Sequence, residues 1–496
     1  MKIALTALKS SPHTKALYCI LIISVLRLAW HYFEPIGMLG DETYYWLWGL
    51  HLDIGYYSKP PMVGWIYALI TAIFGSSTFI YKATGVLLGS GCLYFFYKTL
   101  ALLTNKPNLA LKALITLALT PFHLLNTSFL TTDPPLLFAW MAANYLFARL
   151  LTTEQAKFSD YAWLCLFLGI GHLSKQMMLL QIPLIILVTY LYRPALLRNP
   201  LIWIATLGST IALLPPLIWN AQNEWITFQH TAHHFESARW SLLHFLERLL
   251  SFWGTLCIAL SPIVFFLIFP AFGLFKHIKQ NLAQGFYLIF GAAGFIAMSL
   301  MTLRQEVNPN WPAVFIPGLI ALIFIRYSNY NWRTWFKKAM LPAGTLTALI
   351  MAALLFLEPL LHPLLVQRRA WLGYKELAHT IRDLAPESTQ VIGHTKRFIL
   401  SQLAFHANYR TNVYQWNDSG KIFNQFDFFG SPNPNEKTIV IIERTHEEDP
   451  GLVPEKLEAQ FKALYFLDEL PIHPSREFPR YKIYFTERMQ PTYQSL

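Results

Sequence analysis

Two short acidic motifs stand beside apolar segments of this sequence. Asp41 and Glu42 lie in residues 40–45 (Gly-Asp-Glu-Thr-Tyr-Tyr), directly after the first apolar segment, and Asp133 follows the third and precedes two prolines. Carboxylates near a membrane are costly unless they are solvated or functional, and a carboxylate can withdraw the proton of an attacking hydroxyl group. Each motif can also be read as the cap of a helix, because Asp is favoured at that position.

Three cations occur in comparable positions. Lys59 precedes two prolines that start a helix, whose free N–H groups favour an anion. Lys175 ends a glycine-containing stretch, residues 169–175, and Arg304 begins residues 304–312, which are rich in amides. Such cations can stabilise a departing phosphate, although a lysine beside a membrane can simply extend its ammonium group into water. The side chains expected to contact the substrate are Tyr45, Tyr57, Asn310 and Trp311.

A histidine cluster raises the question of a metal. His230, His233 and His234 have the i, i+3, i+4 spacing that places side chains on one helix face. A zinc site is conceivable, but no acidic fourth ligand stands out, and a wet loop at the membrane interface is the favoured interpretation. We therefore expect no cofactor, with a divalent metal at these histidines left open.

The composition divides the chain into two parts. Only 14% of the 496 residues are charged, against about 25% in soluble proteins. Charges are sparse up to His362 and frequent beyond Val366. This predicts a polytopic α-helical membrane domain in residues 1–365, with an amphipathic outer loop at 34–81, followed by a soluble α/β domain in residues 366–496.

The membrane domain is expected to contain eleven spans, since about 20 apolar residues cross a bilayer. They lie near residues 16–33, 82–98, 109–129, 134–150, 161–173, 177–192, 201–219, 256–275, 285–302, 312–326 and 339–357. Between spans 1 and 2, the aromatic residues expected at the level of the lipid headgroups are Trp46, Trp48, Tyr56, Tyr57, Trp65 and Tyr67.

The basic residues predict the orientation. The formal net charge is +11, and Lys and Arg cluster in short stretches between apolar runs. All strong clusters fall on one side if the N-terminus is cytoplasmic, as the positive-inside rule requires. The sequence therefore predicts membrane lipids rather than nucleic acid as partners. It also predicts that the C-terminal domain and all the acidic and cationic motifs above share the extracytoplasmic face.

The C-terminal part reads as alternating helices and strands. Helices are expected at 374–384, 398–407 and 455–463, and strands at 390–393, 438–442 and 481–486.

These motifs, in their order along the chain, resemble those of the bacterial aminoarabinose-transferase and protein-mannosyltransferase superfamily. The resemblance rests on Asp41-Glu42, Lys59-Pro60-Pro61, Thr132-Asp133 and the Gly-x-Gly-x-x-x-Lys stretch that ends at Lys175. Residues 369–371 (Arg-Ala-Trp) with 376–378 (Glu-Leu-Ala) also resemble the start of the periplasmic domain in bacterial members.

The resemblance implies the fold of the C-type membrane glycosyltransferases and a polyprenyl-phosphate-linked sugar as the donor. It implies Asp41 as the leading catalytic carboxylate, Asp133 as the second acidic residue of the site, and Lys59 as a ligand of the carrier phosphate, with Lys175 as a further candidate. Many relatives have Tyr or His near the last outer turn, where this chain has Asn310-Trp311-Pro312. The identity of the acceptor is therefore not implied.

The expected reaction is an inverting sugar transfer with Asp41 as base, in a multi-pass protein of the bacterial inner membrane whose active site is periplasmic. The acceptor is a glycolipid such as lipid A, another envelope glycan, or a protein hydroxyl, and we favour the first two. The alternative from another class is a non-enzymatic transporter of lipid-linked sugars. Transporters place ionisable groups near the midplane within repeated halves, whereas here they lie at outer helix ends and no repeat is present.

Overall fold

The computed structural model describes residues 11–33, 37–233, 241–308, 310–356, 374–472 and 479–489. The chain forms two compact units. The helical unit comprises Met1–Phe33, Lys59–Met62 and Phe79–Ala352; the mixed unit comprises Glu34–Ser58, Val63–Thr78 and Ala353–Leu496. The domain boundary predicted near residue 365 and the motif at 369–371 lie outside the described residues.

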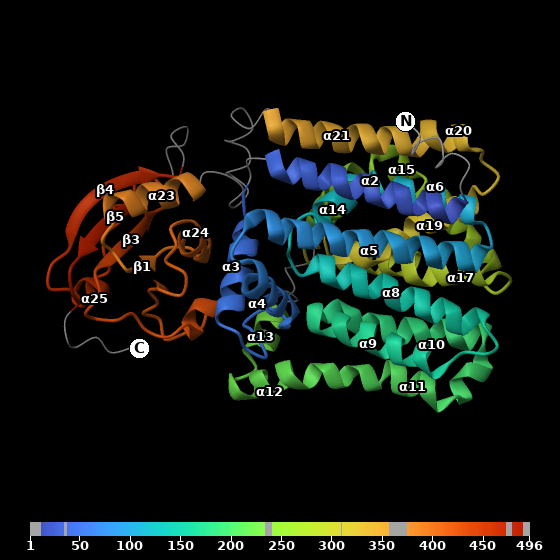
Figure 1. Ribbon diagram of the computed structural model, residues 1–496, viewed down its shortest axis with the longest axis horizontal. Helices are drawn as coiled ribbons and strands as arrows, with labels where there is room; N and C mark the ends of the chain where they lie inside the picture. Colours follow the sequence, from blue (N-terminus) through green and yellow to red (C-terminus); the bar gives the residue numbers. More distant parts are fainter. Residues whose placement is uncertain are drawn as a thin grey trace. The chain divides into compact units, whose positions relative to one another are not determined.

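Helices that pack side by side build the helical unit, for example α8 on α9, α9 on α11, and α6 on both α2 and α19 (Figure 1). Its helices, with short 3₁₀ or π segments labelled η, are α2 (Pro12–Phe33), α5 (Thr78–Thr104), α6 (Pro107–Ala118), α7 (Pro121–Thr127), α8 (Asp133–Thr152), α9 (Phe158–Ser174), η1 (Gln176–Leu180), α10 (Gln181–Tyr192), η2 (Pro194–Arg198), α11 (Pro200–Thr206), η3 (Gly208–Leu213), α12 (Leu214–Gln222), α13 (Ile226–His233), α14 (Leu242–Leu260), α15 (Pro262–Phe266), α16 (Ile268–Ala271), η4 (Phe272–His277), α17 (Leu282–Tyr287), η5 (Leu288–Ala292), α18 (Ala293–Met301), η6 (Trp311–Phe315), α19 (Ile316–Arg326), α20 (Trp332–Trp335), η7 (Phe336–Met340) and α21 (Leu341–Phe356).

Among the described residues, six helical segments are long and apolar enough to cross a membrane, or seven if α6 and α7, bent by 68°, form one span. The six are Pro12–Phe33, Thr78–Thr104, Pro200–Gln222, Leu242–Leu260, Leu282–Met301 and Trp332–Phe356. Large apolar side chains such as Leu21 and Leu26 are about three-fifths exposed on these helices. Water disfavours such surface, whereas lipid accommodates it.

The predicted span at 256–275 is wrong in its boundaries, and the described residues of the other expected segments are mostly helical. The structure starts this helix at Leu242 and breaks it at Ser261, whose φ is +70°. Ser261 precedes a proline, and the residue before proline is disfavoured in the helical conformation. The first half of α14 was missed because Glu247 and Arg248 interrupt its apolar pattern.

A buried arginine compensates for the bend between α6 and α7. At such a break, backbone carbonyl groups lose their partners inside the helix. Arg27 of α2 donates to the carbonyl oxygen of Ala118 at 2.8 Å. Its Nη1 also contacts His123 Nδ1 at 2.6 Å and donates to Thr127 Oγ1 at 3.1 Å. This polar cluster therefore has a structural role in shaping the bundle.

The mixed unit contains one five-stranded sheet with the order β2-β1-β3-β5-β4 (Figure 1). Strands β1, β2 and β3 are parallel, and β5 is antiparallel to both β3 and β4. Its elements are α3 (Gly40–Leu50), α4 (Met62–Phe74), α23 (Tyr374–Leu384), β1 (Gln390–His394), α24 (Arg397–His406), β2 (Val413–Gln415), η8 (Gln425–Phe428), β3 (Thr438–Arg444), α25 (Glu455–Glu458), β4 (Tyr465–Pro471) and β5 (Arg480–Thr486).

The predicted helices at 374–384 and 398–407 and all three predicted strands are confirmed. Ile439 to Ile442 of β3 are all buried, as expected for a strand that is covered on both faces. The predicted helix 455–463 is too long, because α25 ends at Glu458 and Phe461 pairs with Met489 in a β-bridge. Strands β2 and β4 were not predicted: β2 has only three residues, and β4 contains Asp468, Glu469 and Pro471.

Helix α3 packs on α24 within the mixed unit. Thr43 Oγ1 and Ser401 Oγ are 2.9 Å apart, and Gln402 donates to the carbonyl oxygen of Met38 at 2.9 Å. The headgroup level expected for the six aromatic residues here stays a prediction, but five of the six are buried within the protein. Trp46, Trp48, Tyr56, Tyr57 and Tyr67 are buried, because their rings pack within the protein, as in the stacking of Trp48 on Tyr56.

Candidate active site

Three of the predicted site residues meet at Asp133 in the helical unit. Asp133 is the first residue of α8, Lys175 lies in the turn between α9 and η1, and Asn310 precedes η6. Lys175 Nζ is 2.8 Å from Asp133 Oδ1, and Asn310 Nδ2 donates to Asp133 Oδ2 at 3.0 Å. The two prolines after Asp133 fix the start of α8, since proline is preorganised for the first turn of a helix.

The Asp133–Lys175 pair is shielded from water. Only 8% of the Asp133 side chain and 10% of the Lys175 side chain are exposed. Both carboxylate oxygens have a partner, so this group is already neutralised and its direction is fixed. Removing one member of a buried pair typically costs about 3–5 kcal/mol, because the other charge is left without compensation.

Asp41 has different surroundings. It lies in the first turn of α3, and half of its side chain (50%) is exposed. A carboxylate is stabilised there by the free N–H groups of the helix start. Arg397 of α24 approaches it, with 3.6 Å between its Nη2 and Asp41 Oδ1. The mixed unit thus presents an accessible carboxylate whose direction is set by one arginine.

Arg397 is itself held by aromatic rings. Its guanidinium group lies 4.6 Å from the ring centroid of Tyr44 and 4.9 Å from that of Phe398. Burial alone would lower the pKa of Arg397, but Tyr44 and Asp41 outweigh this effect and raise it above its ordinary value. Arg397 therefore stays charged beside Asp41 at any physiological pH.

A second contact fixes the segment that carries Asp41. The backbone N–H of Gln425 donates to the hydroxyl oxygen of Tyr44 at 2.7 Å, and Gln425 Oε1 accepts from the backbone N–H of Tyr57 at 2.7 Å. Burial raises the pKa of Tyr44 to about 12, so its hydroxyl stays protonated. Tyr44 therefore acts as a neutral support under Arg397.

Glu42, predicted beside Asp41 as a catalytic residue, is fully buried. Its Oε2 accepts from the backbone N–H of Leu39 at 2.9 Å, which caps the start of α3. Tyr45 and Tyr57 are each only 7% exposed. These three residues shape the segment around Asp41.

The remaining predicted residues lie elsewhere. Lys59 is half-buried just before α4, Arg304 is exposed, and Trp311 is half-buried at the start of η6. His230 is half-buried on α13, whereas the side chain of His233 and all of His234 lie outside the described residues. In the part of the chain that is described, no group of three or more His, Cys, Asp or Glu side chains could hold a metal ion.

Arg397 and Gln425 were missed by sequence reasoning. Both lie in the soluble part of the chain, where polar and charged residues are frequent and a single one gives no signal. The predicted helix 398–407 even began one residue after Arg397.

The comparisons with protein families and with curated proteins both find glycosyltransferases. The family described as dolichyl-phosphate-mannose-protein mannosyltransferase matches residues 58–219, which include Lys59, Asp133 and Lys175. The lipid A galacturonosyltransferase RgtD of Rhizobium johnstonii is 25% identical to this chain over 404 residues, which are 79% of this chain and 83% of the relative.

Solved structures extend the likeness to nearly the whole chain. ArnT from Cupriavidus metallidurans bound to undecaprenyl phosphate has a TM-score of 0.63 at 12% identity, covering 95% of this chain and 98% of ArnT. The apo form of ArnT has a TM-score of 0.64, also at 12% identity, covering 96% and 98% of the two chains. An oligosaccharyltransferase from Archaeoglobus fulgidus has a TM-score of 0.50 at 11% identity, over 79% of this chain and 63% of its own.

Proposed function

We propose that this chain, which belongs to the superfamily of C-type membrane glycosyltransferases, transfers a sugar from a polyprenyl-phosphate carrier to an extracytoplasmic glycolipid of the lipid A class. The predicted fold and enzyme class are confirmed by the matches to the mannosyltransferase family, to RgtD and to ArnT. The carrier follows from ArnT, which was solved with undecaprenyl phosphate, and the acceptor class from RgtD, a lipid A galacturonosyltransferase.

The observation that carries the mechanism is the accessible carboxylate of Asp41 beside Arg397. A sugar hydroxyl is a poor nucleophile until its proton is withdrawn. We assign this step to Asp41. The hydroxyl oxygen forms a bond to the anomeric carbon while the bond to the carrier phosphate oxygen breaks. Attack from the face opposite the phosphate inverts the anomeric carbon.

The departing phosphate needs positive charge around it. We assign this role to Lys59, which is half-buried, and to Arg304, which is exposed. Lys175 was expected to share it, and in the structure its ammonium group pairs with Asp133 in a shielded site. We therefore assign Lys175 and Asn310 to the orientation of Asp133, and Asp133 to a structural role within the helical unit.

The chain is a membrane protein, and we place it in the bacterial inner membrane with Asp41 and the mixed unit on the periplasmic side. The one-sided basic clusters of the sequence support this orientation. Reporter fusions after Leu103, Tyr192 and Lys338 should be cytoplasmic, and a fusion at Leu496 periplasmic. A cytoplasmic reporter at Leu496 would contradict the assignment.

The function is tested by mass spectrometry of a deletion strain. Lipid A from this strain should lack one sugar, and the wild-type gene should restore it, whereas a gene encoding Asp41→Asn should not. Envelope polysaccharides and total protein are analysed in parallel. If the deletion strain lost a sugar from protein and not from lipid A, the acceptor would be a protein and not a glycolipid. Unchanged lipids, glycans and proteins would refute the transferase assignment in that organism.

A further inference from the structure

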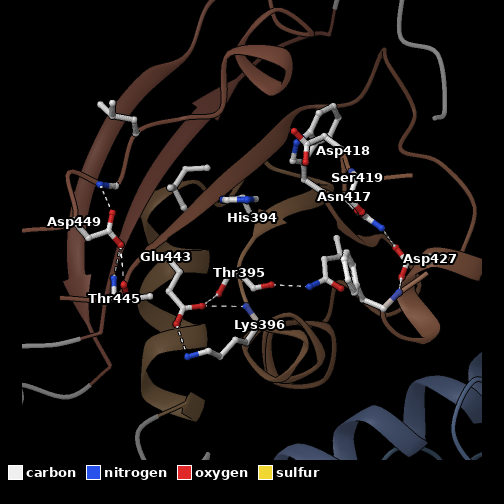
Figure 2. A pocket seen from close by; sticks show the side chains of 16 residues that line it. His394, Thr395, Lys396, Asn417, Asp418, Ser419, Asp427, Glu443, Thr445 and Asp449 are labelled. Atoms are coloured by element: carbon white, nitrogen blue, oxygen red, sulfur yellow. Dashed lines mark hydrogen bonds and ion pairs between the residues drawn. The ribbon is translucent and has the colours of Figure 1, made fainter. Parts of the chain in front are cut away.

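A cavity lined mostly by polar and charged residues lies in the mixed unit, at the carboxyl ends of its parallel strands. Its volume is about 490 Å³, and its lining includes His394 at the end of β1, Gln415 at the end of β2, Glu443 near the end of β3 and Thr445 directly after β3 (Figure 2). The chain passes from β1 to β2 on one side of β1 and then to β3 on the other. Ligands of open α/β sheets bind where the strand order reverses in this way, and the volume falls within the range of small-molecule sites.

The cavity walls are fixed by hydrogen bonds. Asp427 accepts from Asn417 Nδ2 at 2.8 Å and from the backbone N–H groups of Phe423 and Asn424 at 2.8 and 3.0 Å. On another wall, Asp449 accepts from Thr445, and this contact, with further hydrogen bonds from the same loop, lowers the pKa of Asp449 to about 2. The loops therefore keep their shape without a ligand.

Glu443 completes this framework. It accepts from Thr395 Oγ1 at 2.8 Å and from the backbone N–H of Lys396 at 3.1 Å, at the start of α24. Its other oxygen is 3.1 Å from Lys396 Nζ. A carboxylate of the protein thus already accepts from one N–H group at the start of α24, and its negative charge disfavours a phosphate there.

Two residues of the lining, His394 and Asp418, have exposed side chains. In the view of Figure 2, His394 lies between Asp449 on one side and Asp418 on the other. Asp418 and His394 are exposed, so they can bond a ligand. Trp416 and Phe423 add aromatic surface to the lining, and Trp416 packs on the core formed by Ile392, Val440 and Ile442. A pyranose fits such a lining, since its hydroxyl groups donate to carboxylates and its C–H face covers an aromatic ring.

The cavity shares its supports with the candidate catalytic segment. Lys396 lines the cavity, and the next residue, Arg397, contacts Asp41. Asp427 lines it as well, and Gln425, two residues earlier, bonds Tyr44 and Tyr57. A ligand held here is therefore bound by the same unit that presents Asp41.

We propose that this cavity binds an unphosphorylated sugar of the acceptor glycolipid, which rests on the proposed transferase function. Four carboxylates line it, Asp418, Asp427, Glu443 and Asp449, against one lysine and one histidine. This excess of negative charge disfavours phosphate groups and favours hydroxyl groups as donors.

The test compares two double variants of the full chain in nanodiscs. His394→Ala/Asp418→Asn changes the cavity, and His379→Ala/Asp383→Asn changes exposed residues of the same types outside the lining. With lipid A as acceptor, the cavity variant should raise the acceptor KM about tenfold, the loss expected for one or two hydrogen bonds, and change kcat less than about twofold. The control variant should behave like the wild type.

A direct binding measurement separates this proposal from the function itself. Saturation-transfer NMR with the deacylated, dephosphorylated lipid A disaccharide should give a signal with the wild type and the control, and a much weaker one with the cavity variant. An equal signal from all three proteins, or none from the wild type, would overturn the cavity assignment. Displacement of the disaccharide by inorganic phosphate would show that the ligand class is wrong. A wild type that binds the disaccharide without transferring sugar would refute the function and leave the cavity in place.

Discussion

Asp41 and Asp133 both stand at the start of a helix, but their carboxylates have different surroundings. That of Asp41 is half exposed and has Arg397 at 3.6 Å, whereas that of Asp133 is 8% exposed and has Lys175 at 2.8 Å and Asn310 at 3.0 Å. A carboxylate that water reaches on one side can take a proton from a substrate and release it. A carboxylate whose two oxygens already have partners in a shielded site cannot take a proton without breaking those contacts.

This difference separates two roles that the sequence alone does not distinguish. An Asp at the first turn is a favoured helix residue in both motifs. Its function is decided by residues distant in the chain: Arg397 for Asp41, and Lys175 and Asn310 for Asp133. The comparison predicts that loss of Asp41 affects chemistry and leaves stability unchanged, and that loss of Asp133 affects stability first.

Asp41→Asn should have the largest effect on turnover. Asparagine keeps the shape of the side chain but cannot accept the proton, so kcat should fall by about 10²–10⁴. Binding of polyprenyl phosphate and the melting temperature should match the wild type, as measured by ligand titration and thermal unfolding in detergent. Retention of more than about a tenth of wild-type turnover would place the base elsewhere, and Asp133 would be the first alternative.

Asp133→Asn should have the largest effect on stability. It leaves the ammonium group of Lys175 buried without its partner, which should lower the free energy of unfolding by about 3–5 kcal/mol. The double variant Asp133→Asn/Lys175→Gln should recover most of this loss, because no uncompensated charge remains. The measurement is a double-variant cycle of unfolding in detergent.

The matched control for this cycle is an exposed ion pair. Lys437 and Glu387 form one in which 43% and 58% of the side chains are exposed. Glu387→Gln should change the unfolding free energy by about 0–1 kcal/mol. A loss as small as this for Asp133→Asn would mean that the two carboxylates do not differ as described.

Prediction from sequence succeeded where a charged residue stands among apolar neighbours. Asp133 and Lys175 stood out because charges are rare among apolar residues, and the structure brings both together with Asn310. The same contrast misled at α14, where Glu247 and Arg248 hid the first half of an apolar helix. Long helices and the buried strand β3 were predictable from their periodicity and apolar runs.

The contacts that orient Asp41 could not be predicted. Arg397 pairs with Asp41 from more than 350 positions away in the chain. Gln425 bonds Tyr44, on the same helix as Asp41, over a separation of 381 residues. No local pattern encodes a contact at this separation. The burial of Trp46 was missed for the same reason, because it packs on the ring of Phe405.

Lys59→Ala should have an intermediate effect, on the carrier and not on the proton transfer. A charge-assisted hydrogen bond contributes about 1.5–3 kcal/mol, so the affinity for polyprenyl phosphate should fall by about ten- to a hundredfold. Lys462, exposed in the mixed unit, is the control, and Lys462→Ala should bind the carrier like the wild type. Unchanged carrier binding by Lys59→Ala in nanodiscs would remove Lys59 from the phosphate site, and Arg304→Ala would be tested next.

Arg397→Lys should have the smallest effect, because it keeps the charge beside Asp41 and loses the planar contacts with Tyr44 and Phe398. A lysine cannot stack on these rings as a guanidinium group does. We expect kcat to fall about three- to tenfold, from the loss of cation–π contacts and of a well-oriented ion pair. The donor KM should stay unchanged, since we assign Arg397 to the positioning of the base and not to the binding of the carrier.

Arg382 provides the matched control for this substitution. Its guanidinium group lies 4.8 Å from the ring centroid of Tyr409, in the same unit. Arg382→Lys should therefore destabilise the protein about as much as Arg397→Lys does, with kcat unaltered. If both variants lose the same fraction of kcat, the role of Arg397 is only structural. If only Arg397→Lys loses it, the accessible carboxylate owes its catalytic direction to an arginine that no sequence motif contains.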